Sequence, residues 1–344
     1  MKKQLINTLN SFSAFLPTAF LSSFSGQKIV MPAYHAITNE KKAHFNPVLF
    51  KIRGIKEFKS DLDFFLKNFN AVNINELIDS AKNKMPFQKK SFFLSFDDGL
   101  SECYKVIAPI LLEKGIPATF FVNTDFVDNK NLFYRFKVSI FIDSLNKNNY
   151  SDTVLKEISK LLSIVKYSTD SLIKTLLTVD YQSKTILDKI AIVLNINFDN
   201  YLKTEKPYLS SEQINSLIDD GFSIGSHSCD HPLFHQIPIE KQVSQIEESL
   251  KYLRRNHKIK NPVFSFPFTD HLVSKEFFTT VYDKKNPIAD ITFGCAGLKN
   301  DSIPLNLQRI AMDTSNNKAK TIINTEYLYY LLKAPLGKNK IIRK

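Results

Sequence analysis

Two carboxylates and two histidines stand where this sequence could carry out chemistry. Asp97 and Asp98 are adjacent and directly follow the apolar run 90–96, while His227 and His231 lie four residues apart after a second apolar run. Two imidazoles and one carboxylate are a typical ligand set for a catalytic zinc-type ion, and they leave one coordination position open. A second carboxylate beside the ion can act as a general base toward water. The pattern therefore predicts a site for metal-dependent hydrolysis.

The same residues also allow a purely structural interpretation. Asp98 could cap a helix that begins near Ser101, and the two histidines could lie in a loop without binding a ligand. Both motifs, however, follow expected strands, and α/β proteins place their sites at the carboxyl ends of strands. This shared position favours the functional interpretation.

Apolar runs and amphipathic segments alternate around these motifs. The run 90–96 is almost continuously apolar, as is typical of parallel strands covered by helices on both faces. The segment 55–69 instead places Phe58, Leu62 and Phe65 at helical spacing. Further strands are expected at 28–36, 119–123, 222–226, 263–268 and 288–293. Further helices are expected at 101–114, 211–219, 238–256, 274–281 and 326–332. Repeated strand–helix units predict a parallel sheet, either open or closed into a barrel.

Composition limits the class of protein. The chain has 344 residues, of which 43% are hydrophobic and 23% charged, as in an average soluble domain. No run approaches the roughly 18 apolar residues that a membrane-spanning helix needs. The three cysteines are widely spaced and form no CxxC pair, which argues against a disulfide framework. The net charge of +12 comes from scattered lysines without a nucleic-acid-binding motif, so we expect no nucleic-acid partner.

The chain divides into three expected parts. Residues 1–27 form an N-terminal amphipathic segment, residues 28–128 and 207–344 form the α/β unit, and residues 129–206 form a helical insertion. Because the insertion separates the two motifs, it should lie over or beside the mouth of the site. There it would act as a lid or carrier-binding surface, or it would be simple decoration.

The N-terminal segment bears on location. Lys2 and Lys3 give it a basic start, but polar residues and Pro17 interrupt the apolar core that a secretory signal requires. Phe12 and Leu16 lie at helical spacing and favour an amphipathic helix instead. We therefore expect a cytoplasmic protein, with peripheral contact to a membrane as a further possibility and export as the less favoured alternative.

Both motifs resemble those of a known family. Residues 95–99 (S-F-D-D-G), followed by a helix and T-F-F-V, are similar to the first motif of the polysaccharide deacetylases, the NodB-homology or carbohydrate esterase family 4 proteins. Residues 225–232 (G-S-H-S-C-D-H-P) resemble their second motif, H-[ST]-x-x-H-P. The resemblance covers about 28–125 and 207–312. It implies a distorted (β/α)7-type barrel, into which the helical subdomain is inserted, and metal-dependent hydrolysis of an N-acetyl, O-acetyl or N-formyl group on a sugar.

The resemblance also implies individual roles. Carried over by position, Asp97 resembles the catalytic base, while Asp98, His227 and His231 resemble the metal ligands. The implied cofactor is a divalent metal, with Zn2+ as the favoured ion. The implied partner is an N-acylated sugar or glycan substrate, and the oligomeric state is left open.

Two departures from the family pattern leave roles unfilled. The third motif, usually R-x-P-[YF], reads Ser265-Phe266-Pro267-Phe268 here, so Ser265 replaces the arginine that normally braces the base. Arg309, at the end of a late apolar stretch, could replace this brace or bind an anionic substrate group. The late Leu-x-His motif, which supplies the catalytic acid, is absent, and His271 is the best substitute because no histidine follows it.

Three further residues are candidates for substrate binding, namely His35, Pro267 and Phe268. The expected function is metal-dependent hydrolysis of an N-acyl group on a sugar or glycan precursor in surface polysaccharide biosynthesis. One alternative keeps the fold but hydrolyses a non-sugar amide. Another is a degenerate member that binds glycan without turnover, as the lost arginine and late histidine would allow.

Overall fold

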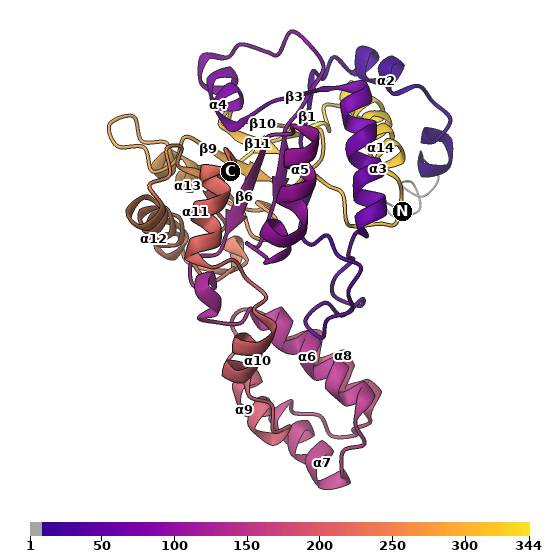
Figure 1. Ribbon diagram of the computed structural model, residues 1–344, viewed down its shortest axis with the longest axis vertical. Coiled ribbons are helices and arrows are strands. Elements are labelled where there is room, and N and C mark those ends of the chain that lie inside the picture. The colour runs from indigo at the N-terminus through magenta and orange to yellow at the C-terminus, as the bar shows by residue number, and fades with distance from the viewer. Residues whose placement is uncertain (1–8) are drawn as a thin grey trace.

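The computed structural model describes residues 9–344 and has a parallel sheet of eight strands at its centre (Figure 1). The strands follow the order β11-β9-β8-β7-β6-β5-β2-β12. Their bounds are β2 Pro32–Tyr34, β5 Leu94–Phe96, β6 Ala118–Val122, β7 Ser223–Ser226, β8 Val263–Ser265, β9 Ile291–Gly294, β11 Asn306–Gln308 and β12 Ile310–Ala311. Every neighbouring pair in this sheet is parallel, so the carboxyl ends of its strands meet at one end.

One short run of chain joins the two edges of this sheet. β11 pairs with β9 at one edge, β12 pairs with β2 at the other, and only Arg309 separates β11 from β12. The amide of Arg309 donates to Gly294 O, and the next amide, that of Ile310, donates to Met31 O. β11 and β12 thus act as one interrupted barrel strand, which we call the closing stave (residues 306–311). When this pair is counted once, the eight strands make a nearly closed barrel of seven strands, or staves.

Helices cover the outside of the barrel because their apolar stripes need a surface to pack against. In α3 (Ile55–Asn68), Phe58, Leu62 and Phe65 are fully buried against the sheet side. The other helices of the barrel are α4 Ile74–Asn83, α5 Ala108–Lys114, α11 Ser211–Asp219, α12 Ile239–His257, α13 Lys275–Val281 and α14 Ala319–Lys333. Two small sheets flank the barrel: β1 (Ile29–Val30) with β4 (Ser91–Phe92) and β3 (Asn70–Ala71), and β10 (Asn300–Asp301) with β13 (Lys340–Ile341).

Local sequence signals explain most element boundaries. Ser210 and Gln213 form a capping box that starts α11 where the sequence predicts a helix. The helix expected at 101–114 instead opens with a π-helical turn, Cys103–Ile107, before α5, because Pro109 has no amide hydrogen for the regular ladder. α4 and the stave 306–311 were not foreseen.

The segment between β6 and α11 projects from one end of the barrel as a separate helical layer (Figure 1). Its helices are α6 Tyr134–Lys147, α7 Asp152–Leu161, α8 Thr169–Leu176, α9 Ile186–Val193 and α10 Phe198–Glu205. They bury a core of their own, to which Phe136, Phe141, Leu172 and Leu187 belong. The loop that follows β2 joins this core through Phe45, so the insertion also contacts the N-terminal part of the barrel.

The N-terminal residues lie against the C-terminal helix. Residues 9–13 are helical, α2 spans Thr18–Ser25, and α2 packs on α14. Lys2 and Lys3, which give the segment its basic start, lie outside the described residues. Within residues 9–344, no helix is both long and apolar enough to cross a lipid bilayer.

Candidate active site

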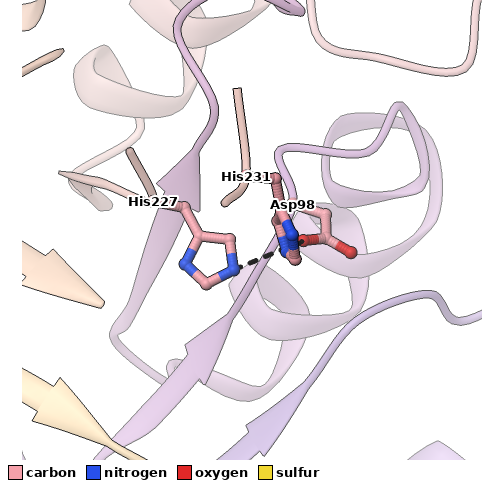
Figure 2. Close-up of side chains that lie close together, drawn as sticks. All are labelled: Asp98, His227 and His231. Carbon is pink, nitrogen blue, oxygen red and sulfur yellow. Dashed lines mark ion pairs between the residues drawn. The ribbon is translucent and has the colours of Figure 1, made fainter. Parts of the chain in front are cut away.

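Three potential metal ligands converge at the carboxyl end of the barrel. Asp98 follows β5, and His227 and His231 lie in the loop after β7 (Figure 2). Asp98 Oδ1 is 3.4 Å from His227 Nε2 and 3.1 Å from His231 Nε2. One ligand atom from each of the three residues lies within 4.8 Å of the others, and all three side chains are buried.

The backbone around this cluster is held in conformations that ordinary residues rarely adopt. Asp98 has φ of 72°, Ser228 of 74° and His231 of 63°. Such left-handed positions cost of the order of 1 kcal/mol or more each, and they persist where surrounding contacts fix them. Ser228 Oγ accepts the amide of His231 at 3.0 Å, and the Asn123 side-chain amide donates to His227 O. These contacts stabilise the loop that carries both imidazoles.

The donor set fits a divalent cation of the zinc type. His227 Nδ1 lies 2.8 Å from Ser265 O, which only accepts, so Nδ1 carries the proton and Nε2 offers its lone pair toward Asp98. Asp98 Oδ1 and His227 Nε2 are buried without a well-formed hydrogen bond. Burial lowers the pKa of His231, which favours the neutral imidazole that metals bind. A bound cation would thus give a partner to these otherwise unsatisfied carboxylate and imidazole atoms.

Asp97 is held by Arg309. The guanidinium donates from both terminal nitrogens, at 2.8 Å to Asp97 Oδ1 and 2.6 Å to Oδ2, and it also binds Ser95 Oγ and Ser265 Oγ. Burial alone would raise the pKa of Asp97, but the adjacent Arg309 charge holds that pKa below its usual value. The arginine missing from the third motif is therefore supplied by the closing stave, and Ser265 bridges the pair.

A carboxylate–imidazole pair, Asp313 with His35, lies in the same cavity as Asp98 and His231. Asp313 Oδ2 accepts both the amide of His35, at 2.9 Å, and its ring Nδ1, at 2.8 Å. Burial of His35 opposes protonation, but the charge of Asp313 outweighs it and raises the pKa of His35 to about 10. The His35 side chain is still partly exposed, so it is a proton donor that a ligand can reach.

His35, Asp313, Asp98 and His231 all line one cavity of about 370 Å³. The wall of this cavity is otherwise largely apolar and comes from the loop after β2, from Leu100 after the first motif, from the start of the insertion and from the third motif. The residues of this wall include Phe45, Val48, Leu49, Phe50, Ile52, Leu100, Phe133, Phe136 and Phe268. Phe133 and Phe268 also contact the His231 ring, with centroids 4.4 and 4.5 Å away. The insertion therefore contributes directly to the mouth of the site.

The remaining residues singled out from the sequence lie elsewhere. Pro267 is buried and does not line the cavity, whereas Phe268 does. His271 is exposed and lies outside the residues that line the cavity, which does not suit the role of catalytic acid. The reason is that its neighbour Asp270 turns into the interior, where it accepts from Asn306 and Gln308, and not toward His271.

Asp313 is the residue of this site that sequence reasoning missed. It directly follows the end of the apolar stretch Ile310–Met312, in the same way that Asp97 follows β5. The rule that a carboxylate after a buried strand marks a site would have found it, had the short stave been recognised as a strand.

The sequence matches a family model described as "Polysaccharide deacetylase" over residues 84–277, which is more than half of the chain. No curated protein sequence matches the chain.

Several solved structures share this fold. The Streptococcus pyogenes deacetylase PplD, in complex with acetate, is 15% identical with a TM-score of 0.53, covering 87% of this chain and 98% of that chain. IcaB from Ammonifex degensii is 14% identical with a TM-score of 0.53 (88% and 98%). The de-N-acetylase from Aggregatibacter actinomycetemcomitans is 15% identical with a TM-score of 0.52 (86% and 99%).

At these identities the similarity shows the fold, and the expected distorted (β/α)7-type, NodB-like barrel is confirmed. Membership follows from the family model, whose matched region contains Asp97, Asp98 and both histidines. The chain belongs to the polysaccharide deacetylase family.

Proposed function

We propose that this protein removes the N-acyl group, acetyl or formyl, from an amino sugar in a glycan or glycan precursor, and that it does so with a bound Zn2+-type ion. Family membership supports a hydrolase of non-peptide carbon–nitrogen bonds. The observation that carries the proposal is the convergence of Asp98, His227 and His231 near two differently held groups, Asp97 and His35. The titles of the structural neighbours, which name deacetylases, agree with it.

Asp98, His227 and His231 would hold the ion, and when bound it would polarise water and the carbonyl oxygen of the amide. Asp97 would accept the proton of the attacking water at the carboxylate. Its pairing with Arg309 keeps it ionised and fixes its direction. The base would then be ready at neutral pH without having to lose a proton first.

His35 would protonate the leaving nitrogen. It lines the cavity, Asp313 holds its Nδ1, and its Nε2 remains available to donate. Water adds to the acyl carbon, the carbon–nitrogen bond breaks, the amine takes the proton from His35, and the acid is released as acetate or formate. Asp313 keeps the imidazole charged and oriented between these events.

The degenerate glycan-binding alternative is less well supported. It arose because the sequence lacks the third-motif arginine and the late histidine. Arg309 pairs with Asp97, His35 pairs with Asp313 and lines the cavity, and these contacts support the proposed brace and acid. The partly exposed, charged His35 inside the cavity is the pair member that a protein binding glycan without turnover would not need. Hydrolysis of a non-sugar amide remains for experiment to decide.

The deciding experiment offers the metal-loaded protein β-linked N-acetylglucosamine oligomers and measures both acetate and new primary amine. We expect equal amounts of the two products. Asp97→Asn should keep its metal, as measured by mass spectrometry, but lose turnover, while His231→Ala should lose both. His271→Ala, which lies outside the cavity, is the matched control and should retain activity.

Failure to release acetate or formate from any N-acetylated or N-formylated sugar, by protein shown to contain one metal ion per chain, would refute the sugar substrate. Release of acid from a simple aryl amide under the same conditions would then favour the non-sugar alternative. A cytoplasmic location, which none of these measurements addresses, stays a prediction to be checked by fractionating cells that express the chain.

A further inference from the structure

Four phenylalanines project from the N-terminal helical segment into solvent. The exposed fractions are 66% for Phe12, 88% for Phe15, 54% for Phe20 and 68% for Phe24. Phe20 and Phe24 lie against each other, with ring centroids 4.4 Å apart. We call these four residues the phenylalanine face. Single exposed apolar residues are ordinary, but four large exposed aromatic side chains within thirteen residues are a concentration of the kind that marks an interaction site.

The inward side of the same segment combines apolar packing with hydrogen bonds: Leu21 is 2% exposed and belongs to the barrel core, and the remaining contacts are polar. Ser13 is fully buried, and its hydroxyl bonds Thr321 O at 3.2 Å and the Thr325 hydroxyl at 2.9 Å. Asn324 donates from its amide to both Ser13 O and Leu16 O at 2.9 Å. Hydrogen bonds to α14 therefore fix the orientation of the segment, and the phenylalanines cannot turn inward without breaking them.

A group of lysines borders this face. The ammonium of Lys90 donates hydrogen bonds to the side of α2, at 2.8 Å to Ala19 O and 3.1 Å to Ser23 Oγ. Lys89 precedes it, and Lys28 is brought alongside because its carbonyl accepts the amide of Ser91. Within residues 9–344 none of these three lysines forms an ion pair. No aspartate or glutamate occurs in the sequence before Glu40.

We propose that the phenylalanine face docks onto the surface of an anionic lipid bilayer, with Phe12, Phe15, Phe20 and Phe24 entering the headgroup region and Lys28, Lys89 and Lys90 contacting lipid phosphates. Interfacial binding needs apolar side chains on one side and cations at their border, and this segment has both. Since α2 spans only eight residues, the segment lies on the bilayer and does not cross it.

The charge pattern selects a bilayer over a second copy of the chain. A symmetric dimer through this face would bring the lysines of one copy close to those of the other, with no acidic residue in the segment to offset them. An anionic membrane supplies the opposite charge. The insertion, whose residues line the cavity, lies at the other end of the long axis of the molecule (Figure 1), so docking leaves the mouth of the site free.

The chain contains no tryptophan, which allows a direct test. Phe15→Trp places a single fluorescent reporter at the most exposed position of the face. Vesicles of phosphatidylcholine with phosphatidylglycerol should shift its emission to shorter wavelength and sediment the wild-type protein. Vesicles of phosphatidylcholine alone should do so far less. Emission that stays unshifted, together with wild-type protein that stays in the supernatant with anionic vesicles, would overturn the proposal.

Paired variants distinguish binding through the phenylalanine face from nonspecific hydrophobic adsorption to vesicles. Phe15→Ser with Phe24→Ser should weaken partitioning to anionic vesicles by about tenfold or more, while Val165→Ser with Ile192→Ser, on the exposed insertion, should change it less than about twofold. Circular dichroism checks that each variant is folded. If light scattering shows that the phenylalanine variant only converts a dimer to a monomer, with vesicle binding unchanged, a second copy covers the face and the membrane proposal is wrong.

Discussion

Arg309 holds Asp97 from 212 positions away in the sequence, through two parallel hydrogen bonds and a buried ion pair. The geometry is that of a planar fork meeting a carboxylate, which a lysine cannot reproduce. Arg309→Lys should therefore keep the charge but lose the orientation of the base. We expect kcat for N-acetyl sugar to fall about 10²-fold or more, with metal content unchanged.

A second variant tests whether Asp97 needs an arginine at position 309 itself or only an arginine within reach. Arg309→Ala leaves Asp97 buried without a partner and should destabilise the fold by about 3–5 kcal/mol. Adding Ser265→Arg returns an arginine to the third motif and should recover part of both stability and activity. Equal kcat in wild type and Arg309→Lys, measured at saturating substrate, would show that the pair is only structural.

His35 and Asp313 should act as one proton-donating unit. His35→Gln is expected to lower kcat by about 10²–10⁴-fold with a small change in KM, because proton delivery is lost while binding remains. His271→Gln, an exposed histidine outside the cavity, serves as the control. If the two variants behave alike, His35 is not the acid.

Asp313→Asn probes the same unit through pH. The negative charge of Asp313 raises the pKa of His35, so its removal should lower that pKa. Since His35 must be protonated to donate, the alkaline limb of the kcat profile should move to lower pH. A limb that stays in place would show that a different group titrates there.

Arg343 near the C-terminus should contribute strongly to stability. Its guanidinium contacts the carboxylates of Asp270 and Asp301, and all three side chains are at most 3% exposed. Arg343→Ala leaves two buried charges unpaired and should cost about 3–5 kcal/mol in urea unfolding. The exposed Arg255→Ala should change stability by less than about 0.5 kcal/mol. Asp270→Asn and Asp301→Asn, added to Arg343→Ala, should restore part of the loss.

The lowered pKa of buried His44 predicts how the free energy of unfolding depends on pH. Burial, reinforced by the charge of Lys42, lowers its pKa to about 3 in the folded protein, whereas an unfolded histidine titrates near 6.5. The unfolded chain therefore binds this proton first, and the folded state loses stability as the pH falls below 6.5 toward 3. One proton corresponds to about 1.4 kcal/mol per pH unit.

The control for this prediction is His44→Phe with Tyr201→Phe, which removes both partners of the hydrogen bond between the two side chains. Its free energy of unfolding should fall less steeply between pH 6 and pH 4 than that of the wild type. Identical slopes would mean that His44 is protonated in the folded state.

Periodicity predicted the staves that are continuously apolar, and strand ends correctly indicated where Asp98, His227 and His231 would meet. The strand at 306–311 was not predicted from periodicity because its inward-facing side chains are polar. Asn306 and Gln308 are buried and donate to Asp270 inside the barrel, so polar residues interrupt the apolar stretch that ends at Arg309 and hide the strand. A buried strand with satisfied polar side chains has no hydrophobic signature.

Sequence adjacency also misled the choice of the acid. Asp270 and His271 are neighbours in the chain and suggested an oriented imidazole. The fold instead pairs His35 with Asp313, which are 278 positions apart, and no local pattern connects them. The proposed acid thus rests on a contact between the ends of the first and last staves, which only tertiary structure reveals.

The position of Arg309 between β11 and β12 has a consequence for biogenesis. The last stave must dock against strands made at the beginning of synthesis, since Ile310 pairs with Pro32. Such distant contacts form late and slowly. Until they form, Asp97 lacks its Arg309 partner and His35 lacks its Asp313 partner. On the roles proposed above, an incompletely folded molecule would be hydrolytically inactive, and catalytic competence would begin only when the barrel closes.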